Sequence, residues 1–345
     1  NTDGTGLRQL TFPPSEEAEL VERYQLSRGY HHGTDDMHPC YLPGGDVVFT
    51  STRCRYGVLC NRGDDFTVKN LYRMDGDGRN IRPLTTSPLS EASPAMLPDG
   101  RIIYHRWEYV DKTAGNAKCL WAMNPDGTDT AEVYGNTICF PETMIYPRPI
   151  PGTTSKIVFL GTSHCCPNNA LGAVIVIDTN DDIRSPETMN YVTDDVRAYH
   201  HNGFQFQDEH GAWRHDKTGK PGRLFRDPYP LSEDLFIAAR KPEGLAWQDP
   251  KGYDLVLLDG DGEGTPLYKD ETISCWHPYP LRVRAVPPDR SQAHDERLAA
   301  RGEAICIVTD VYVGMNAPEV SPVTATDLTS RTAPAPVQVK RGTVK

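Results

Sequence analysis

The feature of this 345-residue chain that most constrains its fold is a short motif that recurs about every 50 residues. In each copy a polar or aromatic residue precedes a proline, and two residues later comes an apolar or proline-marked turn. The five copies read HPCYLP, SPAMLP, YPRPIP, DPYPLS and HPYPL, with their prolines at positions 39, 94, 147, 228 and 278. A period of this length is typical of one supersecondary unit that packs against copies of itself.

Apolar runs with β-branched and aromatic residues follow each motif: residues 47–50, 102–104, 157–160, 235–238 and 281–283. Tight turns such as Gly44-Gly45 and Asp99-Gly100 join the motif to the apolar run that follows it. A third strand-like segment then ends at a further turn such as Asp77-Gly78. Strands joined by hairpins and repeated at this period predict the four-stranded blades of an all-β protein, a β-propeller.

The first residues resemble the end of a blade. Residues 1–11, NTDGTGLRQLT, align with residues 75–85, DGDGRNIRPLT, which follow the third run of the first unit. Propellers remove an exposed sheet edge when the N-terminal strand completes the last blade. We therefore expect residues 1–12 to pair with the blade that contains residues 275–313. Five full units and this strand favour six blades, with seven possible.

Three stretches interrupt the period. A Glu-rich stretch (13–33) and a second one (291–302) are predicted to be helical or loop insertions. The polar stretch 184–222 is too long for an ordinary connection, so it is a candidate functional loop. A single propeller is expected over 1–327, and 328–345, with its Ala-Pro repeat, is expected to be a linker or tail that leads to a further domain.

Composition narrows the class of partner. A net charge of -11 and scattered Lys and Arg residues argue against nucleic acid, which needs a concentrated basic face. No apolar run has the length of a membrane-spanning helix. Other protein domains or subunits of a larger assembly are the expected partners.

Nine cysteines are many for a cytosolic scaffold. Cys54 and Cys60 flank a short polar segment that can bring their Cα atoms within disulfide distance, so we predict a local disulfide. Cys275 and Cys306 lie in segments that can also pair. Disulfides favour an oxidising compartment, periplasmic or extracellular; buried free thiols are the alternative.

Several longer strings are more specific than a generic propeller signature. They begin at Asp36 (DMHPCYLP), Leu71 (LYRMD), Asp99 (DGRIIYHRWEY), Asp227 (DPYPLS) and Ile273 (ISC). Together they resemble the WD40-like propeller portion of the hydrazine synthase alpha subunit family and its bacterial relatives. The resemblance covers most of the chain and implies a module of a larger exported protein. Members of that family carry haem on Cys-x-x-Cys-His, and this sequence has no such motif. We therefore expect no haem, and no other cofactor except a possible metal ion, within this chain.

The residue before each aligned proline is the first candidate for a site. Equivalent positions on the inner strands of a propeller converge on its central channel, so these side chains should surround one opening. They are His38, Ser93, Tyr146, Asp227 and His277. The proline after each lacks a backbone donor, which suits a strand end near an opening better than the centre of a ladder. In the alternative interpretation each caps its own turn or fills the channel with hydrogen bonds.

Metal ligands are a second interpretation of the same region. Histidine and cysteine side chains are the ligands that transition metals prefer. The candidates are His38, His200, His201, His277, His164, Cys165 and Cys166. Loop surface is the alternative for His200 and His201, and the cysteine pair has no second cluster of matched spacing.

Two functions are compatible with these patterns. The first is a scaffold or interaction module without catalysis of its own. The second is an enzyme at the channel mouth, such as a metal-dependent propeller lyase or hydrolase that uses clustered His and Asp. Fold alone does not separate them, because propellers carry out both roles.

Overall fold

The computed structural model describes residues 3, 5–24, 33–58, 67–108, 118–164, 170–198, 203–290 and 296–303. The chain divides into two compact units, residues 1–291 and 292–345. The predicted propeller boundary at 327 therefore falls inside the second unit, of which the structure describes helix α2 (Glu296–Ala300) and the residues after it up to 303. Helix α1 (Glu17–Tyr24) lies in the first unit, inside the Glu-rich stretch 13–33.

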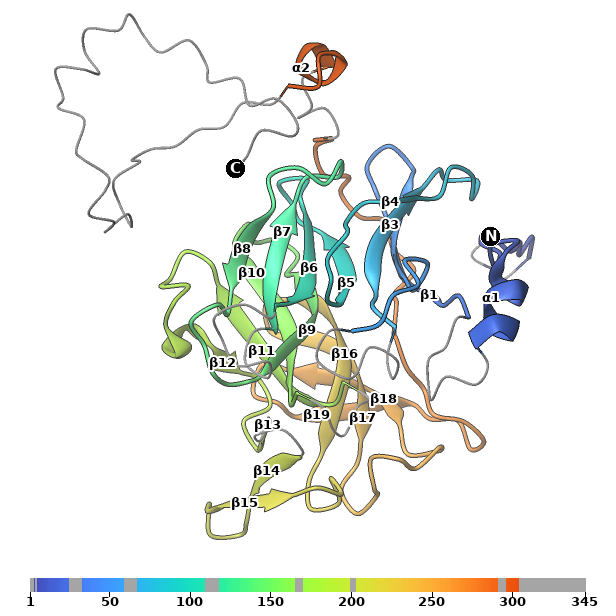
Figure 1. Cartoon of the computed structure of the whole chain (residues 1–345). Helices are drawn as coiled ribbons and strands as arrows, with labels where there is room; N and C mark the ends of the chain where they lie inside the picture. The colour runs from blue at the N-terminus through green and yellow to red at the C-terminus, as the bar shows by residue number, and fades with distance from the viewer. Residues whose placement is uncertain are drawn as a thin grey trace, which may run out of the picture. The chain divides into compact units, whose positions relative to one another are not determined.

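Two antiparallel sheets of four strands and one antiparallel sheet of eight strands make up most of the first unit (Figure 1). The eight-stranded sheet consists of two four-stranded halves, which are called the third and fourth sheets below. The first contains β1 (Asp36–Tyr41), β2 (Val47–Ser51), β3 (Asn70–Met74) and β4 (Arg82–Pro83), and the second contains β5 (Glu91–Met96), β6 (Ile102–Trp107), β7 (Lys118–Met123) and β8 (Ala131–Tyr134). The third contains β9 (Thr143–Pro149), β10 (Lys156–Thr162), β11 (Gly172–Asp178) and β12 (Asn190–Tyr191), and the fourth contains β16 (Leu224–Ser232), β17 (Leu235–Lys241), β18 (Asp254–Asp259) and β19 (Gly264–Tyr268).

The first strands of the four sheets lie side by side. Strand β1 contacts β5, β5 contacts β9, and β9 contacts β16. A single bridge between Gly172 and Phe225 also links the third sheet to the fourth. This is the blade arrangement that the repeat predicts, so the all-β, propeller-like class is confirmed.

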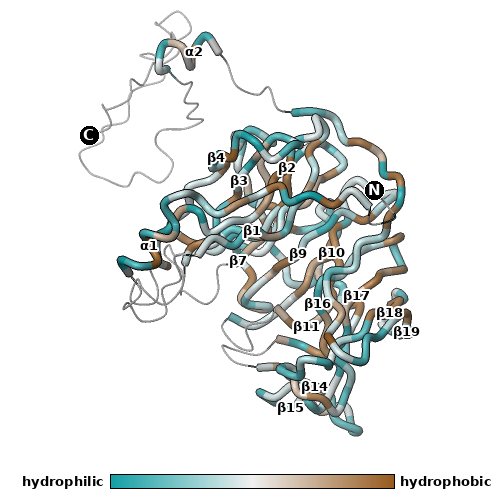
Figure 2. Tube along the Cα trace, turned by 90° about the vertical axis from the view of Figure 1, so that its right-hand side faces the viewer, coloured by the Kyte–Doolittle hydropathy of each residue, from teal (hydrophilic) through white to brown (hydrophobic). Residues whose placement is uncertain are grey.

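Burial between neighbouring sheets explains why the strands read as nearly continuous apolar runs. Alternate residues of one strand face opposite neighbours. In β10, Val158 and Leu160 pack toward the fourth sheet, whereas Ile157 and Phe159 pack toward the second. Figure 2 shows the resulting apolar stretches along β10, β11, β16 and β17.

The stretch 184–222 differs from the predicted loop because much of it is β-structure. It contains a short 3-10 helix (Pro186–Thr188), the fourth strand β12, and a separate sheet of β13 (Val196–Ala198), β14 (Phe204–Gln207) and β15 (Trp213–Asp216). Val196, Phe204 and Phe206 are buried in the core shared by the second and third sheets. This apolar face explains the difference: a segment that contributes to a core needs paired backbone groups.

The fifth unit also differs from the prediction. Residues 281–283 were expected to be a strand, but residues 271–290 contain none. Leu281 and Val283 are 77% and 99% exposed. A strand needs a partner for its backbone groups, and no described segment pairs with this one.

The N-terminal segment occupies a repeated position. A Cβ added to Gly78 would lie 2.3 Å from the Leu10 carbonyl oxygen. The same close approach recurs between Gly127 and Leu84, at 2.9 Å, and between Gly262 and Val192, at 2.3 Å. Leu84 and Val192 directly follow β4 and β12, the last strands of their sheets. Leu10 thus lies where the end of a preceding blade would lie, as its alignment with Leu84 suggests, although residues 5–12 form no strand.

The predicted Cys54–Cys60 disulfide is not present. Cys54 is a free thiol whose Sγ lies 3.1 Å from the Val68 carbonyl oxygen, among the apolar side chains of Val58, Val68 and Leu89. Burial raises the pKa of this thiol, which keeps it protonated and able to donate that hydrogen bond. Cys275 is free as well, and Cys60 and Cys306 lie outside the described residues.

Candidate functional site at the channel mouth

The residue before each aligned proline has a left-handed backbone. The φ angles of His38, Ser93, Tyr146, Asp227 and His277 lie between 51° and 59°. In β1, β5, β9 and β16 the proline stands inside the strand, and the pairing register shifts at that point in all four. The prolines therefore mark β-bulges and not the strand ends that the sequence suggested. A bulge leaves one residue out of the ladder, so the missing N–H of proline costs no bond there.

The bulges of β1 and β9 and the left-handed His277 bring three rings together. The ring centroids of His38 and Tyr146 are 5.5 Å apart, those of His38 and His277 5.7 Å, and those of Tyr146 and His277 5.6 Å. All three pairs meet edge to face, with interplanar angles of 77°, 61° and 82°. Residues up to 239 positions apart in the sequence thus form one cluster.

Asp227 joins the cluster through a buried ion pair. Its Oδ2 accepts a hydrogen bond of 2.9 Å from Nε of Arg226, and the two side chains are 2% and 6% exposed. Nη2 of Arg226 also donates to the Tyr146 hydroxyl at 3.4 Å. Ser93 is buried in the same set of bulges, and its backbone N–H donates to Thr50 Oγ1.

Asp227 also positions His277. Its Oδ2 accepts the backbone N–H of His277 at 3.2 Å, and its Oδ1 lies 3.3 Å from Nδ1 of the ring. A carboxylate beside Nδ1 favours the tautomer with its proton there, so Nε2 is the lone-pair nitrogen. His277 is 39% exposed, and ligands therefore have access to it.

The surroundings keep both imidazoles neutral at pH 7. Burial lowers the pKa of His38 to about 3, with smaller contributions from His277, Arg148 and Arg226. Burial also lowers the pKa of His277, and this effect outweighs the opposing attraction of Asp227. The pKa of Tyr146 is raised, mainly by burial, so its hydroxyl stays protonated.

Two buried polar atoms at these left-handed positions have no hydrogen-bond partner. They are Nδ1 of His38, which belongs to the ring cluster, and Oγ of Ser93, at the equivalent position of its own unit. Each such atom costs about 1–3 kcal/mol if nothing satisfies it. Such atoms can bind a polar group of a ligand or a water molecule.

A metal ion fits this arrangement poorly. Among the described residues no group of three or more His, Cys, Asp and Glu side chains has the geometry to hold one. Asp227 is engaged by Arg226, and His164 lies beside Lys118, whose ammonium contacts its Nδ1 and its carbonyl oxygen. Cys165, Cys166, His200 and His201 lie outside the described residues.

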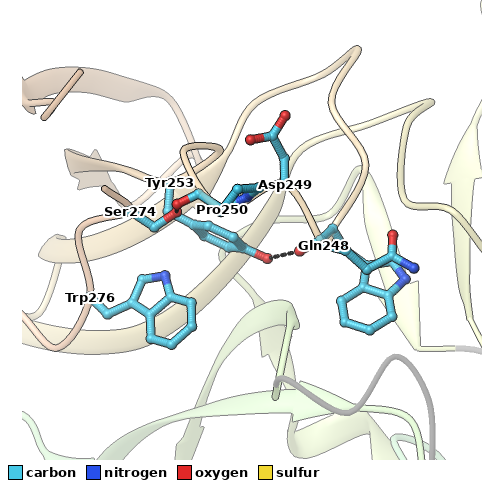
Figure 3. Close-up of a pocket in the computed structure, with 7 residues that line it drawn as sticks. Gln248, Asp249, Pro250, Tyr253, Ser274 and Trp276 are labelled. Carbon is cyan, nitrogen blue, oxygen red and sulfur yellow. Dashed lines mark hydrogen bonds between the residues drawn. The ribbon is translucent and has the colours of Figure 1, made fainter. Parts of the chain in front are cut away.

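A neighbouring cavity shares a wall with the cluster. It has a volume of about 310 Å³ and is lined by Trp247, Gln248, Asp249, Pro250, Tyr253, Ser274 and Trp276. Figure 3 shows Tyr253 donating to the Trp247 carbonyl, a bond of 2.6 Å, while the Asp249 carboxylate points away from Trp276. The guanidinium of Arg226 stacks on Trp276 at 4.1 Å, so this tryptophan contacts the cluster and also lines the cavity.

Arg226 and Trp276 were not among the candidates from the sequence. Both stand one residue before a candidate, Asp227 and His277, in the repeated motif. The repeated motif therefore pointed to both positions. In β16 the bulge shifts the register, so Arg226, next to the candidate Asp227, reaches the same cluster.

Comparison with known proteins supports the fold alone. No protein-family model matches the chain, and no curated protein matches it by sequence. Hydrazine synthase from Kuenenia stuttgartiensis aligns with a TM-score of 0.52 and 17% identity over 76% of this chain and 31% of its own. TolB from Acinetobacter baumannii (TM-score 0.36, 12% identity, 70% and 45% covered) and a puromycin-hydrolyzing peptidase from Mycobacterium tuberculosis (0.38, 14%, 77% and 41%) also align. The chain thus spans about a third of the hydrazine synthase chain that it matches. Of these three alignments the one with hydrazine synthase has a TM-score above 0.5, and at 17% identity it supports the fold and no activity.

Proposed function

We propose that this domain is a β-propeller scaffold and binding module of a larger exported protein. We further propose that the cluster of His38, Tyr146, Asp227 and His277, called the channel-mouth cluster below, holds a small polar ligand. One observation supports this proposal: the four residues come from separate repeat units and converge on one place. Buried polar atoms there have no partner in the protein and are available to a ligand. Natural proteins rarely leave such atoms unsatisfied. The similar part of hydrazine synthase is likewise only a portion of a longer chain.

The same proposal includes the compartment and the partners of the protein. We propose that it is periplasmic or extracellular and that it binds other protein domains or subunits of a larger assembly. None of the helices in the described ranges has the length and apolar character needed to cross a bilayer. The cysteines of the described residues form no disulfide that would support an oxidising compartment, so this part rests on the resemblance of the repeat strings.

We further propose a ring of six blades closed by the N-terminal segment. Leu10 packs on the first sheet beside Val47, Phe49, Tyr72 and Met74. It occupies there the place that Leu84 takes on the next sheet. In a closed ring the sixth blade would lie next to the first sheet and cover this face. Residues 1–12 resemble the last strand of a blade in sequence, so we propose that they belong to that sixth blade.

Deletion of residues 1–12 is expected to lower the melting temperature by several degrees. It removes Leu10 from an apolar cluster and opens the face of the first sheet, and loss of a partly buried leucine costs on the order of 2 kcal/mol. Differential scanning calorimetry and size-exclusion chromatography measure the effect. An unchanged melting curve with a monomeric elution profile would refute the closure.

An enzyme at the channel mouth is the second candidate. One observation favours it: the carboxylate of Asp227 lies beside Nδ1 of a neutral, accessible His277. Such a pair can take up a proton at Nε2 as a general base. Among the described residues, no group of three or more metal ligands completes the constellation.

Native mass spectrometry of the protein purified from its own source tests the binding module. A bound small molecule adds a mass to the intact chain, and that mass identifies it. We expect the increment in the wild type and its loss in Asp227→Asn and His277→Gln. The control His210→Gln changes a side chain that is 80% exposed and far from the repeat motifs, so it should keep the increment.

The same samples separate the two candidates. Elemental analysis that finds one transition-metal ion per chain, lost in His277→Gln, would favour the enzyme. Absence of any increment in the wild type, together with identical spectra of all variants, would contradict a ligand at the channel mouth.

A further inference from the structure

Three arginines surround one tyrosine next to the channel-mouth cluster. The Cζ atoms of Arg148, Arg284 and Arg282 lie 5.1, 5.5 and 6.0 Å from the centroid of the Tyr229 ring. Arg148 also lies 4.4 Å from the ring of Tyr279, which is 5.5 Å from that of Tyr229. Arg148, Tyr229 and Tyr279 each stand two residues after a left-handed residue of the repeat, so the same symmetry that forms the cluster brings them together.

None of these arginines forms an ion pair with a carboxylate among the described residues. Their hydrogen bonds go to neutral groups. Arg284 Nε donates to the Tyr229 hydroxyl at 2.7 Å, Arg148 donates to the Tyr279 hydroxyl, and Arg282 reaches the carbonyls of Pro230 and Leu231 at 3.5 Å. By contrast, Arg53, Arg73, Arg226 and Arg240 all pair with aspartates. In a chain of net charge -11 a group of three unpaired arginines is an exception.

The arrangement leaves hydrogen-bond donors free. Nε of Arg148 is buried without a partner. The hydroxyls of Tyr229 and Tyr279 accept from arginines, so their own protons remain available to a second acceptor. Three guanidinium groups around one ring also repel one another, and an anion between them would relieve that repulsion.

We propose that Arg148, Arg282 and Arg284, with the hydroxyls of Tyr229 and Tyr279, bind an oxyanion: a phosphate, sulfate or carboxylate group. The planar guanidinium matches the paired oxygens of such groups, and stacking on tyrosine holds it in place. Arg282, Arg284 and Tyr279 are exposed, so an anionic group of a larger molecule has access. This site goes beyond the proposed channel-mouth ligand, because it uses other residues and another ligand chemistry.

Isothermal titration calorimetry of the full chain with sodium phosphate, sodium sulfate and sodium acetate tests the site, at pH 7.5 and constant ionic strength set with chloride. We expect saturable 1:1 binding of at least one of the three anions. The anion that binds identifies the chemical group that the site recognises. Arg148→Gln and Arg284→Gln should each weaken that binding by about tenfold or more, because each removes charge-assisted hydrogen bonds. Arg148→Lys keeps the positive charge but loses the paired N–H donors of the planar guanidinium. The affinity of this variant for the anion should therefore fall between those of the wild type and Arg148→Gln.

Arg214→Gln is the matched control. Arg214 is an exposed arginine that pairs with Asp208, and its loss should leave the affinity within about twofold. Asp227→Asn, which tests the channel-mouth ligand, removes a negative charge and should not weaken the anion. Failure of either site is therefore visible independently of the other. The proposal is overturned if none of the three anions gives a saturable signal above chloride, or if Arg148→Gln and Arg284→Gln bind like the wild type.

Discussion

Asp227→Ala is expected to lower the free energy of unfolding by about 3–5 kcal/mol, the usual cost of removing one partner of a buried ion pair. Arg226 would keep its charge at 6% exposure and lose its 2.9 Å hydrogen bond. His277 would lose both its contacts with the carboxylate. Alanine at the left-handed φ of 52° adds about 1 kcal/mol of backbone strain. Urea denaturation at pH 7.5 measures the sum.

Glu233→Ala provides the comparison. Glu233 pairs with Lys156, and both side chains are exposed, at 48% and 37%. Exposed pairs contribute about 0–1 kcal/mol, so this variant should stay close to the wild type. Asp227→Asn keeps an acceptor and a residue type that tolerates left-handed φ, and its loss should be smaller than that of Asp227→Ala. A loss below about 1 kcal/mol in Asp227→Ala would show that the ion pair does not organise the site.

The repeat made the four sheets and the convergence of the cluster predictable. Its period is visible because the first four units each repeat a proline, an apolar strand and a glycine turn. Equivalent positions in equivalent units must lie at equivalent places, which is why His38, Tyr146, Asp227 and His277 meet. That argument needs no knowledge of side-chain conformation.

The local backbone at those positions was not predictable. A residue before proline normally prefers extended φ, yet all five residues are left-handed. Because the bulge was not foreseen, the prolines were placed at strand ends, and Arg226 and Trp276 were overlooked. Tertiary pairing, which no single segment encodes, decides the shape of a bulge.

Pairing also decided the other differences. The stretch 184–222 reads as polar, but Val196, Phe204 and Phe206 give it an apolar face that a three-stranded sheet buries. Leu281 and Val283 have strand propensity without a described partner. Cys54 is spaced for a disulfide, yet its thiol faces the Val68 carbonyl.

Stability is expected to fall between pH 8 and pH 5, and His105→Asn should remove about 2 kcal/mol of that loss. Burial lowers the pKa of His105 to about 4, against the smaller opposing effect of its hydrogen bond to Met144. The unfolded chain has a histidine pKa near 6.5, so below this value it binds more protons than the folded chain. The contribution of a neutral His105 is therefore complete above about pH 6.5 and is lost as the pH falls toward 4.

Asparagine at position 105 isolates this effect because its side-chain amide can donate to the Met144 carbonyl, as Nδ1 of the imidazole does at 2.7 Å, and does not titrate. Urea unfolding of both proteins at pH 8, 6.5 and 5 gives the two slopes. His38→Asn tests the same effect in the channel-mouth cluster, where burial lowers the pKa to about 3, and the double variant should have the flattest profile. His210→Asn changes an exposed turn and should keep the wild-type slope. If His105→Asn loses as much stability between pH 8 and pH 5 as the wild type, proton uptake by His105 does not contribute to acid unfolding.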